Sequence, residues 1–374
     1  MAHAYTPGLR VARHAVLRRE RRLPLKGTVL VQPGDPVEAD TVVARTQLPG
    51  NVQTVNLAAK LGVDPAMIPE TLTIPLGTTV RKDQTIASAK SLFGLVKNTA
   101  TAPVDGTVES VSHVTGQLIF REPPIPVEVQ AYVKGVVAEV LPEEGVVVET
   151  HGAFLQGIFG VGGESYGEIA FAARAPDEAL APSRLLPAHR GKVVVAGAYI
   201  SYAGLMKARE VGAAAVVVGG FDDQDLRQLL GRDLGVAITG SEDLGLTLIL
   251  TEGFGHIRMA DRTWHLLETH QGSLASVSGA TQIRAGVMRP EIIIPHADAS
   301  GGATERDHST GLEAGSLLRV IRQPYFGRIG KVIDLPPELQ ALDSEAQVRV
   351  LTVEFADDGS RAVVPRANVE LIAE

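Results

Sequence analysis

GDPVEADTVVA (residues 34–44) and GTTVRKDQTIA (77–87) are the two stretches that decide the fold. Each begins at a glycine turn, places a valine three residues later, and reaches a short apolar run after a few polar residues. Related units follow at 101–120 and 133–150. Short apolar runs punctuated by turn residues in this way are typical of β-strands, and they predict a small barrel or sandwich.

With a third stretch, APVDGTVESV (102–111), these segments resemble the half-motifs of biotinyl/lipoyl-type barrel-sandwich hybrid domains. The resemblance covers about residues 25–150. It implies a barrel-sandwich hybrid, a fold that relatives use in carrier domains, membrane-fusion adaptors, RNA polymerase insertions and subunits of redox complexes.

Carrier domains of this type place a modified lysine on a hairpin, a fixed distance before the proline of the second half-motif. Counting back from Pro103 reaches Leu95, and the nearby Lys90 and Lys97 are both out of register. The resemblance therefore implies an unmodified scaffold, and no cofactor is expected.

The composition is that of a folded chain with several domains. At 374 residues the chain is too long for one ordinary core, and about two to four domains are expected. Apolar residues make up 45% and charged residues 21%, which is the balance of a globular protein. Aromatic residues are only 4%, so the cores must be filled by Val, Leu, Ile and Ala.

Charge and cysteine content exclude several classes of function. A net charge of −8 argues against a protein that coats nucleic acid by bulk attraction, and DNA binding is not predicted. The absence of cysteine excludes disulfides, thiolate nucleophiles and cysteine-bound zinc. No apolar run has the length of a transmembrane helix. We therefore expect a soluble cytoplasmic protein without a membrane span.

The first 24 residues are basic, and they are expected to form an N-terminal arm ahead of the barrel-sandwich hybrid at 25–164. Their arginines face a single acid, Glu20: Arg10, Arg13, Arg18, Arg19, Arg21 and Arg22. Two interpretations stay open. The segment contacts an acidic partner, RNA or anionic lipid, or it is a solvated strand edge whose charge discourages aggregation.

The sequence period changes after a Pro- and Ala-rich connection expected at 165–186. KVVVAG (192–197) and AAVVVGG (214–220) are continuous apolar runs, and stretches with helical spacing alternate with them. Such alternation predicts a three-layer α/β domain with a mainly parallel sheet, placed at 187–295.

Ligands of such sheets bind beyond the carboxyl ends of the strands. One of these ends, TEGFGH (251–256), brings a hydroxyl, a carboxylate and an imidazole to the rim. The candidate ligand-binding residues are Gly219, Gly220, Thr251, Glu252, Gly253, Gly255 and His256. Either this is an ordinary loop between a strand and a helix, or it is a site for a small molecule or a phosphorylated ligand.

No catalytic residue and no metal ligand is predicted. His265 and His270 are five positions apart, so one helix does not present both on the same face. His296 and Asp298 belong to a polar Gly/Ser/Thr stretch, expected to be a linker at 296–312. The serines lack the setting of a nucleophile elbow.

GSLLRVIRQPYFGRIGKVIDL (315–335) resembles a KOW motif, and the strands that follow it would complete an SH3-like barrel at 313–374. The resemblance implies contact with RNA or protein through the loop of the motif. The candidate partner- or RNA-binding residues are Arg319, Arg322, Tyr325, Phe326, Arg328 and Lys331. The module is net acidic, which weakens the case for RNA, and the aromatic pair could equally belong to the barrel core.

These features together predict a β-rich multidomain protein with an α/β component. We expect a non-enzymatic scaffold or adaptor that binds a protein partner through its barrel modules. Two alternatives stay open: a small-molecule sensor or enzyme that uses the α/β rim, and an RNA-binding KOW factor. The sequence leaves the oligomeric state undetermined.

Overall fold

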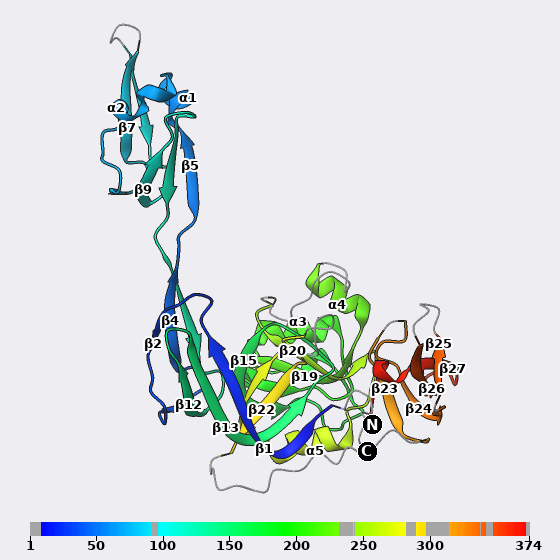
Figure 1. The fold of residues 1–374 in the computed structure, drawn as a ribbon. Coiled ribbons are helices and arrows are strands. Elements are labelled where there is room, and N and C mark those ends of the chain that lie inside the picture. Colours follow the sequence, from blue (N-terminus) through cyan, green and yellow to red (C-terminus); the bar gives the residue numbers. More distant parts are fainter. Residues whose placement is uncertain are drawn as a thin grey trace.

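The computed structural model describes residues 9–91, 96–231, 242, 244–281, 289–296, 314–322, 324–336, 338–341 and 347–371. Strands make up 47% and helices 15% of the structure, in several sheets with a half-barrel at the C-terminus (Figure 1). The prediction of a strand-rich, multidomain chain is confirmed. No helix among the described residues has both the length and the apolarity needed to cross a membrane.

A 13-stranded sheet forms the body of the molecule. Its main order is β14-β20-β19-β17-β15-β21-β22-β13-β12-β3, with β1 paired to β13, and with β16 and β18 attached beside β19. The strands are β1 (Val11–Arg22), β3 (Pro36–Val37), β12 (Gly135–Leu141), β13 (Gly145–Gln156), β14 (Phe159–Val161), β15 (Glu164–Phe171), β16 (Ala179–Leu180), β17 (Val193–Val195), β18 (Tyr199–Ile200), β19 (Ala215–Phe221), β20 (Thr247–Phe254), β21 (Leu274–Ser278) and β22 (Glu291–Pro295).

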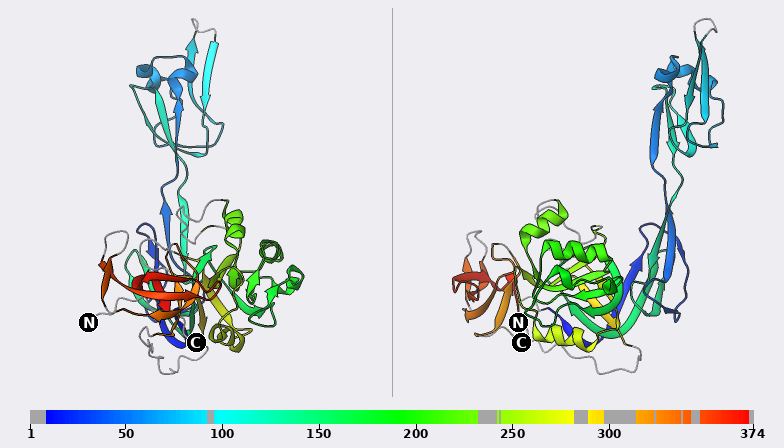
Figure 2. Two further views of the ribbon diagram at one scale, coloured as in Figure 1. Left: turned by 90° about the vertical axis from the view of Figure 1, so that its right-hand side faces the viewer. Right: turned by 180° about the vertical axis from the view of Figure 1, so that it is seen from behind.

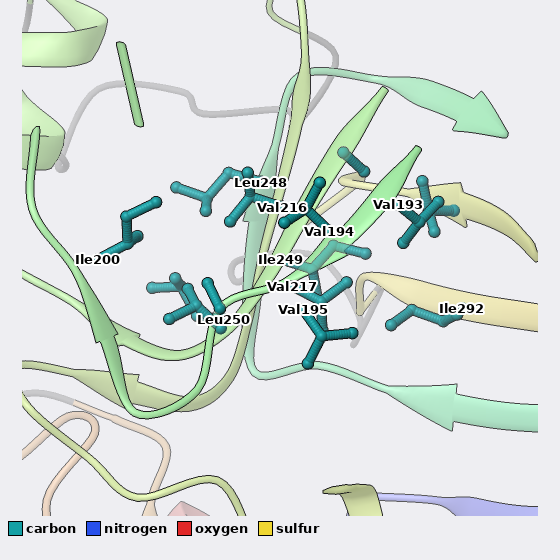
Figure 3. Close-up of a cluster of buried hydrophobic side chains, with 14 of the residues drawn as sticks. Val193, Val194, Val195, Ile200, Val216, Val217, Leu248, Ile249, Leu250 and Ile292 are labelled. Atoms are coloured by element: carbon teal, nitrogen blue, oxygen red, sulfur yellow. The ribbon is translucent and has the colours of Figure 1, made fainter. Parts of the chain in front are cut away.

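Four neighbouring strands of this sheet, β15, β17, β19 and β20, run parallel. All residues of β17 and β19 are buried, because layers of the fold cover both of their faces. Figure 3 shows their valines packed against the leucine and isoleucine side chains of β20. In Figure 1, α3 and α4 lie on one side of these strands and α5 on the other. The helices of this region are α3 (Tyr202–Val211), α4 (Asp223–Leu230), α5 (Asp261–Thr269), η2 (Pro182–Arg184) and η3 (Pro187–His189).

The parallel strands do not form a sheet of their own. β15 also pairs antiparallel with β21, and the sheet continues through β22 into β13. The segment expected as a connection, 165–186, therefore begins inside a central strand, and the segment expected as an α/β domain, 187–295, shares its sheet with the N-terminal half. The prediction rested on the Pro- and Ala-rich residues 175–184, whereas 164–171 alternates in burial as a strand does.

The basic N-terminal segment is a strand rather than a free arm over the part that the structure describes. β1 pairs with β13 from Val11, opposite Leu155, to Arg22, opposite Gly145. Its arginines are used within the chain: Arg18 with Glu149 (2.7 Å), Arg19 with Glu291 (2.5 Å), Arg21 with Glu164 (2.7 Å), and Arg22 with Glu20 and Glu144. These pairs favour the strand-edge interpretation over an arm that contacts a partner.

Residues 50–122 form a separate body, here called the inserted module, that stands away from the rest of the chain on two strands (Figures 1 and 2). It has its own buried core, in which Leu57, Ile68 and Phe120 are completely buried. Its elements are β5 (Val52–Asn56), α1 (Leu57–Leu61), η1 (Pro65–Met67), α2 (Ile68–Thr71), β6 (Thr79–Val80), β7 (Thr85–Ser91), β8 (Val96–Thr101), β9 (Gly106–Val111) and β10 (Gln117–Arg121). The segment expected as one unit, 25–164, therefore contains two cores.

Two chain segments, residues 48–51 and 122–125, form the neck that joins the inserted module to the body (Figure 1). The second core lies where this neck meets the body, in what we call the base unit. The base unit contains β3, β12 and a three-stranded sheet of β2 (Thr28–Val29), β4 (Val42–Leu48) and β11 (Ile125–Gln130). Val43, Ala131 and Val148 are buried in this core.

The base unit and the inserted module repeat one hydrogen-bonding pattern. In the base unit, the amide of Gly34 donates to Val137, two residues beyond Gly135. In the inserted module, the amide of Gly77 donates to Val108, two residues beyond Gly106. A Cβ at Gly135 or Gly106 would overlap the backbone carbonyl of a neighbouring strand, so both positions require glycine.

The repetition shows at which point of the base unit the chain of the inserted module begins and ends. The antiparallel pair of β4 and β11 corresponds to that of β7 and β8. The inserted module connects β4 to β11, whereas residues 92–95, which include Leu95, connect β7 to β8 and lie outside the described residues. One copy of the unit is therefore nested inside the hairpin of the other.

The C-terminal half-barrel has the strand order β25-β26-β24-β23-β28, with β27 paired to β26. Leu318, Val332, Leu351 and Phe355 belong to its buried core. Its elements are β23 (Leu317–Val320), β24 (Ile329–Asp334), β25 (Leu339–Ala341), β26 (Gln347–Phe355), β27 (Arg361–Pro365), η4 (Arg366–Asn368) and β28 (Val369–Leu371).

Candidate functional site

The half-barrel docks onto the sheet rim where a ligand site was expected. Glu252, near the end of β20, is only 5% exposed. Its carboxylate accepts hydrogen bonds from the backbone amide of Ala260 (3.1 Å) and from Nη2 of Arg319 (2.8 Å). Arg319 lies on β23 of the half-barrel and is 1% exposed. A residue expected to bind a ligand, Glu252, and a residue expected to bind a protein partner or RNA, Arg319, therefore bind each other.

This contact is part of a buried network of four charges. Nη1 of Arg319 donates to Glu370 at 3.0 Å, and Arg289 forms a second ion pair with Glu370. All four side chains are at least nine-tenths buried. Two guanidinium groups and two carboxylates balance one another, as buried charges must.

The glycines of the rim are needed for close packing. A Cβ at Gly219 would overlap the carbonyl oxygen of Ile257, and one at Gly220 would overlap that of Gly255. The loop after β20 therefore lies directly on the end of β19. On the other side of the loop, the carbonyl oxygen of Gly327 in the half-barrel lies 3.4 Å from the Cβ position of Gly253.

Aromatic side chains also pack against one another where the half-barrel meets the body. The ring of Phe254 lies 6.0 Å from that of Phe326 and 5.4 Å from that of Phe159, measured between ring centres. Tyr325 packs instead against Phe355 at 5.2 Å. Both aromatic residues of the KOW-like turn are thus engaged within the chain.

The helix N-termini at the rim are capped by the chain itself. Ser201 and Asp225 accept from the first amides of α3, and Asp222 accepts from the amide of Gln224 in α4. These oxygens occupy the positions at which an anionic ligand would be held. Thr251 donates to the backbone oxygen of Val218.

His256 is the exposed member of the predicted rim set. Its ring stacks on Tyr199 with 3.5 Å between ring centres and 16° between planes. Burial, followed by the nearby Asp225 and Asp222, raises the pKa of Tyr199. The geometry does not gather His256 with Glu252, which is buried beneath the half-barrel.

The predicted cation cluster of the half-barrel is also divided. Arg319 is buried, and Arg328 forms ion pairs with Asp357 (2.5 Å) and Asp358 (2.7 Å). Hydrogen bonds from Ser360, together with Arg328, lower the pKa of Asp358 to about 2. Only Arg322 and Lys331 of the four predicted cations are exposed.

The inserted module carries an open groove of about 600 Å³ that the sequence did not reveal. Its lining is mostly apolar: Pro69, Leu72, Thr73, Ile74, Pro75, Leu76, Ser110, Val111 and His113. Next to it, Met67 is 52% and Val114 87% exposed. Apolar side chains in such a surface gain stability by burial against a partner.

The rings of three of the ten histidines lie close together: His14 on β1, His270 after α5 and His296 after β22. The ring of His296 lies 4.9 Å from that of His14 and 5.6 Å from that of His270. Burial lowers the pKa of His296, and His14 and His270 lower it further. No sequence spacing predicts this cluster, because strand pairing assembles it from distant segments.

His296 was expected in a linker, but its amide donates to the carbonyl of His151, so it still belongs to the sheet. Asp298 lies outside the described residues. As their side chains are placed, no three His, Asp or Glu residues of the described chain converge on a common metal ion. No protein-family model and no curated protein matches this chain.

Proposed function

We propose that this chain is a non-enzymatic cytoplasmic scaffold that binds an apolar segment of a protein partner through its inserted module. The observation that carries the proposal is that the half-barrel covers the carboxyl end of the parallel strands. Glu252 is paired with Arg319 under the half-barrel, so the usual ligand position of a parallel sheet is occupied by the chain itself. The apolar groove of the inserted module is, by contrast, open to solvent.

The proposed fold assignments rest on hydrogen bonding and strand pairing. We infer that the base unit and the inserted module are two barrel-sandwich hybrid units, supported by their shared hydrogen-bonding pattern. The parallel strands with α3, α4 and α5 support an α/β component. The antiparallel half-barrel around the KOW-like stretch 315–335 supports an SH3-like barrel.

The position of the inserted module supports its role in binding. In all views the inserted module projects from the body on its neck (Figures 1 and 2), so the described residues of the body lie away from it. The module folds around its own core. A partner could therefore reach the groove without disturbing the body.

A pull-down with two designed versions of the chain tests the proposal. Leu48 and Ile125 are cross-strand neighbours, so Asn-Gly can replace residues 49–124 as a two-residue hairpin turn. We expect the full chain to retain a specific protein at low and moderate salt, and the shortened chain to fold but lose it. Equal retention by both versions would contradict the proposal, as would retention by neither.

A matched pair of point variants locates the surface. Leu76, which lines the groove, and Val52, which does not, are each 49% exposed on the inserted module. Leu76→Asp should weaken partner binding at least about 10-fold, because a carboxylate would be buried without a counter-charge. Val52→Asp should leave binding unchanged. A similar loss for both variants would place the interface elsewhere.

Each alternative depends on predicted residues that are engaged in part within the chain. A ligand at the rim would have to displace Arg319 from Glu252. An RNA-binding role would depend on Arg322 and Lys331 alone among the predicted cations, on a net-acidic module. We therefore rank both below the scaffold.

A further inference from the structure

The histidine cluster has the composition of a metal site and plays no part in the proposed scaffold function. Its three interacting rings come from separate elements: His14 from β1, His270 from the end of α5, and His296 from the residue after β22. A ligand that bound all three would tie the N-terminal strand to the helix and to the last strand of the body.

The ring spacing suits a shared ion. Imidazole nitrogens bind zinc at roughly 2.0–2.1 Å, which puts ring centres roughly 5 Å from one another around a tetrahedral ion. The ring centres of His14 and His296 are 4.9 Å apart, and those of His270 and His296 are 5.6 Å apart.

His270 is already oriented as metal-bound histidines are. Its Nδ1 lies 2.8 Å from the carbonyl oxygen of Leu266. Because a carbonyl oxygen only accepts, Nδ1 must be the donor of this bond, and in the neutral ring Nε2 is then the nitrogen with the free lone pair. A backbone carbonyl that holds the second nitrogen of the ring in this way is the usual outer partner of a ligating histidine.

We propose that His14, His270 and His296 bind one divalent ion of the class that prefers imidazole, such as Zn²⁺ or Ni²⁺, with water completing the coordination. The rings as placed do not converge on one point. The rings of His270 and His296 are parallel within 2°, so their in-plane lone pairs do not meet at one point. The exposed His14 and the half-buried His296 must therefore both rotate about their side-chain torsions to bring their nitrogens to an ion beside His270. His151 is not needed as a ligand, since it lies beside Glu149 at 3.6 Å.

The test uses the full chain without an affinity tag, stripped of metal by a chelator and titrated calorimetrically at pH 7.5. Zn²⁺ and Ni²⁺ should bind with one site per chain and raise the unfolding temperature, whereas Mg²⁺, which prefers oxygen ligands, should do neither. His270→Gln and His296→Gln should each weaken Zn²⁺ binding at least about 10-fold. Co²⁺ should give the visible absorption of a low-coordinate nitrogen site.

His265→Gln is the matched control, because His265 is exposed on α5 and its ring lies beside Glu268, away from the ring cluster. It should leave Zn²⁺ affinity unchanged. His14→Gln alters an exposed side chain, and it keeps the test valid if the more buried variants fail to fold. The proposal is overturned if Zn²⁺ shows no saturable single site, or if the control weakens binding as much as the three ligand variants do.

Discussion

The half-barrel and the inserted module are joined to the body in opposite ways. The half-barrel is docked by buried charges, with Arg319 between Glu252 and Glu370. The inserted module is held by a two-stranded neck whose side-chain contacts, such as Asn51 with Glu122, are exposed to water. Buried ion pairs fix one arrangement of groups, whereas exposed polar contacts contribute little. From this comparison we predict that the half-barrel is fixed to the body, whereas the inserted module unfolds and moves separately from it.

Removing Arg319 should have the largest effect, because it would leave the buried carboxylate of Glu252 without a counter-charge and Glu370 with Arg289 alone. Arg319→Met is expected to lower the free energy of unfolding by about 3–5 kcal/mol, measured by denaturant titration. The control is Arg361→Met, since Arg361 pairs with Glu354 on the surface, and it should cost about 0–1 kcal/mol. Adding Glu252→Gln to Arg319→Met should restore part of the loss, because Arg289 still balances the charge of Glu370. Equal stability of Arg319→Met and Arg361→Met would show that the junction is not locked by charge.

The two equivalent glycines test whether the nested units unfold separately. Gly135→Ala and Gly106→Ala each place a Cβ against a backbone carbonyl, and each should cost about 1–3 kcal/mol through overpacking. In calorimetry, Gly106→Ala should lower only the transition of the inserted module, and Gly135→Ala only that of the body. Thr107→Ala, beside Gly106, is the control. A shift of both transitions by either glycine variant would mean that the neck couples the two units.

The sequence predicted the strands of residues 25–164 from local signals, as parts of one unit, and could not predict that they form two cores, one nested inside the other. Glycine turns and alternating apolar residues specify strands over short windows, and both half-motifs form the expected turn and strand. Which strands pair across a gap of some 70 residues is decided by the whole fold. Glu252 and Arg319 illustrate the same limit: each is polar in an apolar context, and only the tertiary structure shows that each is the partner of the other.

A smaller effect concerns the pH dependence of the body. His189, in η3, accepts a hydrogen bond at Nδ1 from the amide of Leu186. Burial, and then Arg184, lowers its pKa. The folded state therefore favours the neutral ring of His189. Its contribution to the free energy of unfolding is complete above the pKa of the unfolded state, about 6.5, and is lost as the pH falls through the lower pKa of the folded state. The inserted module has a single histidine, the exposed His113, and should not share this loss.

Asn can keep the hydrogen-bond acceptor of His189 without titrating. His189→Asn should therefore flatten the pH dependence of body unfolding between pH 7 and pH 5, while the inserted module unfolds as before. An unchanged pH profile in the variant would assign that dependence to other groups.

A substitution in the neck should have the smallest effect on the free energy of unfolding and the largest effect on the motion of the inserted module relative to the body. The side chain of Asn51 donates to Glu122 at 3.1 Å in an exposed position, so Asn51→Ala should change the free energy of unfolding by less than about 0.5 kcal/mol. The loss of a contact that spans the neck should still widen the range of angles between the inserted module and the body. Amide relaxation or a pair of fluorescent labels, one on each body, would report that range, with Gln53→Ala as the neighbouring comparison. A stability loss as large as that of Arg319→Met would mean that the neck, like the half-barrel junction, is a fixed interface, because only desolvated contacts reach that magnitude.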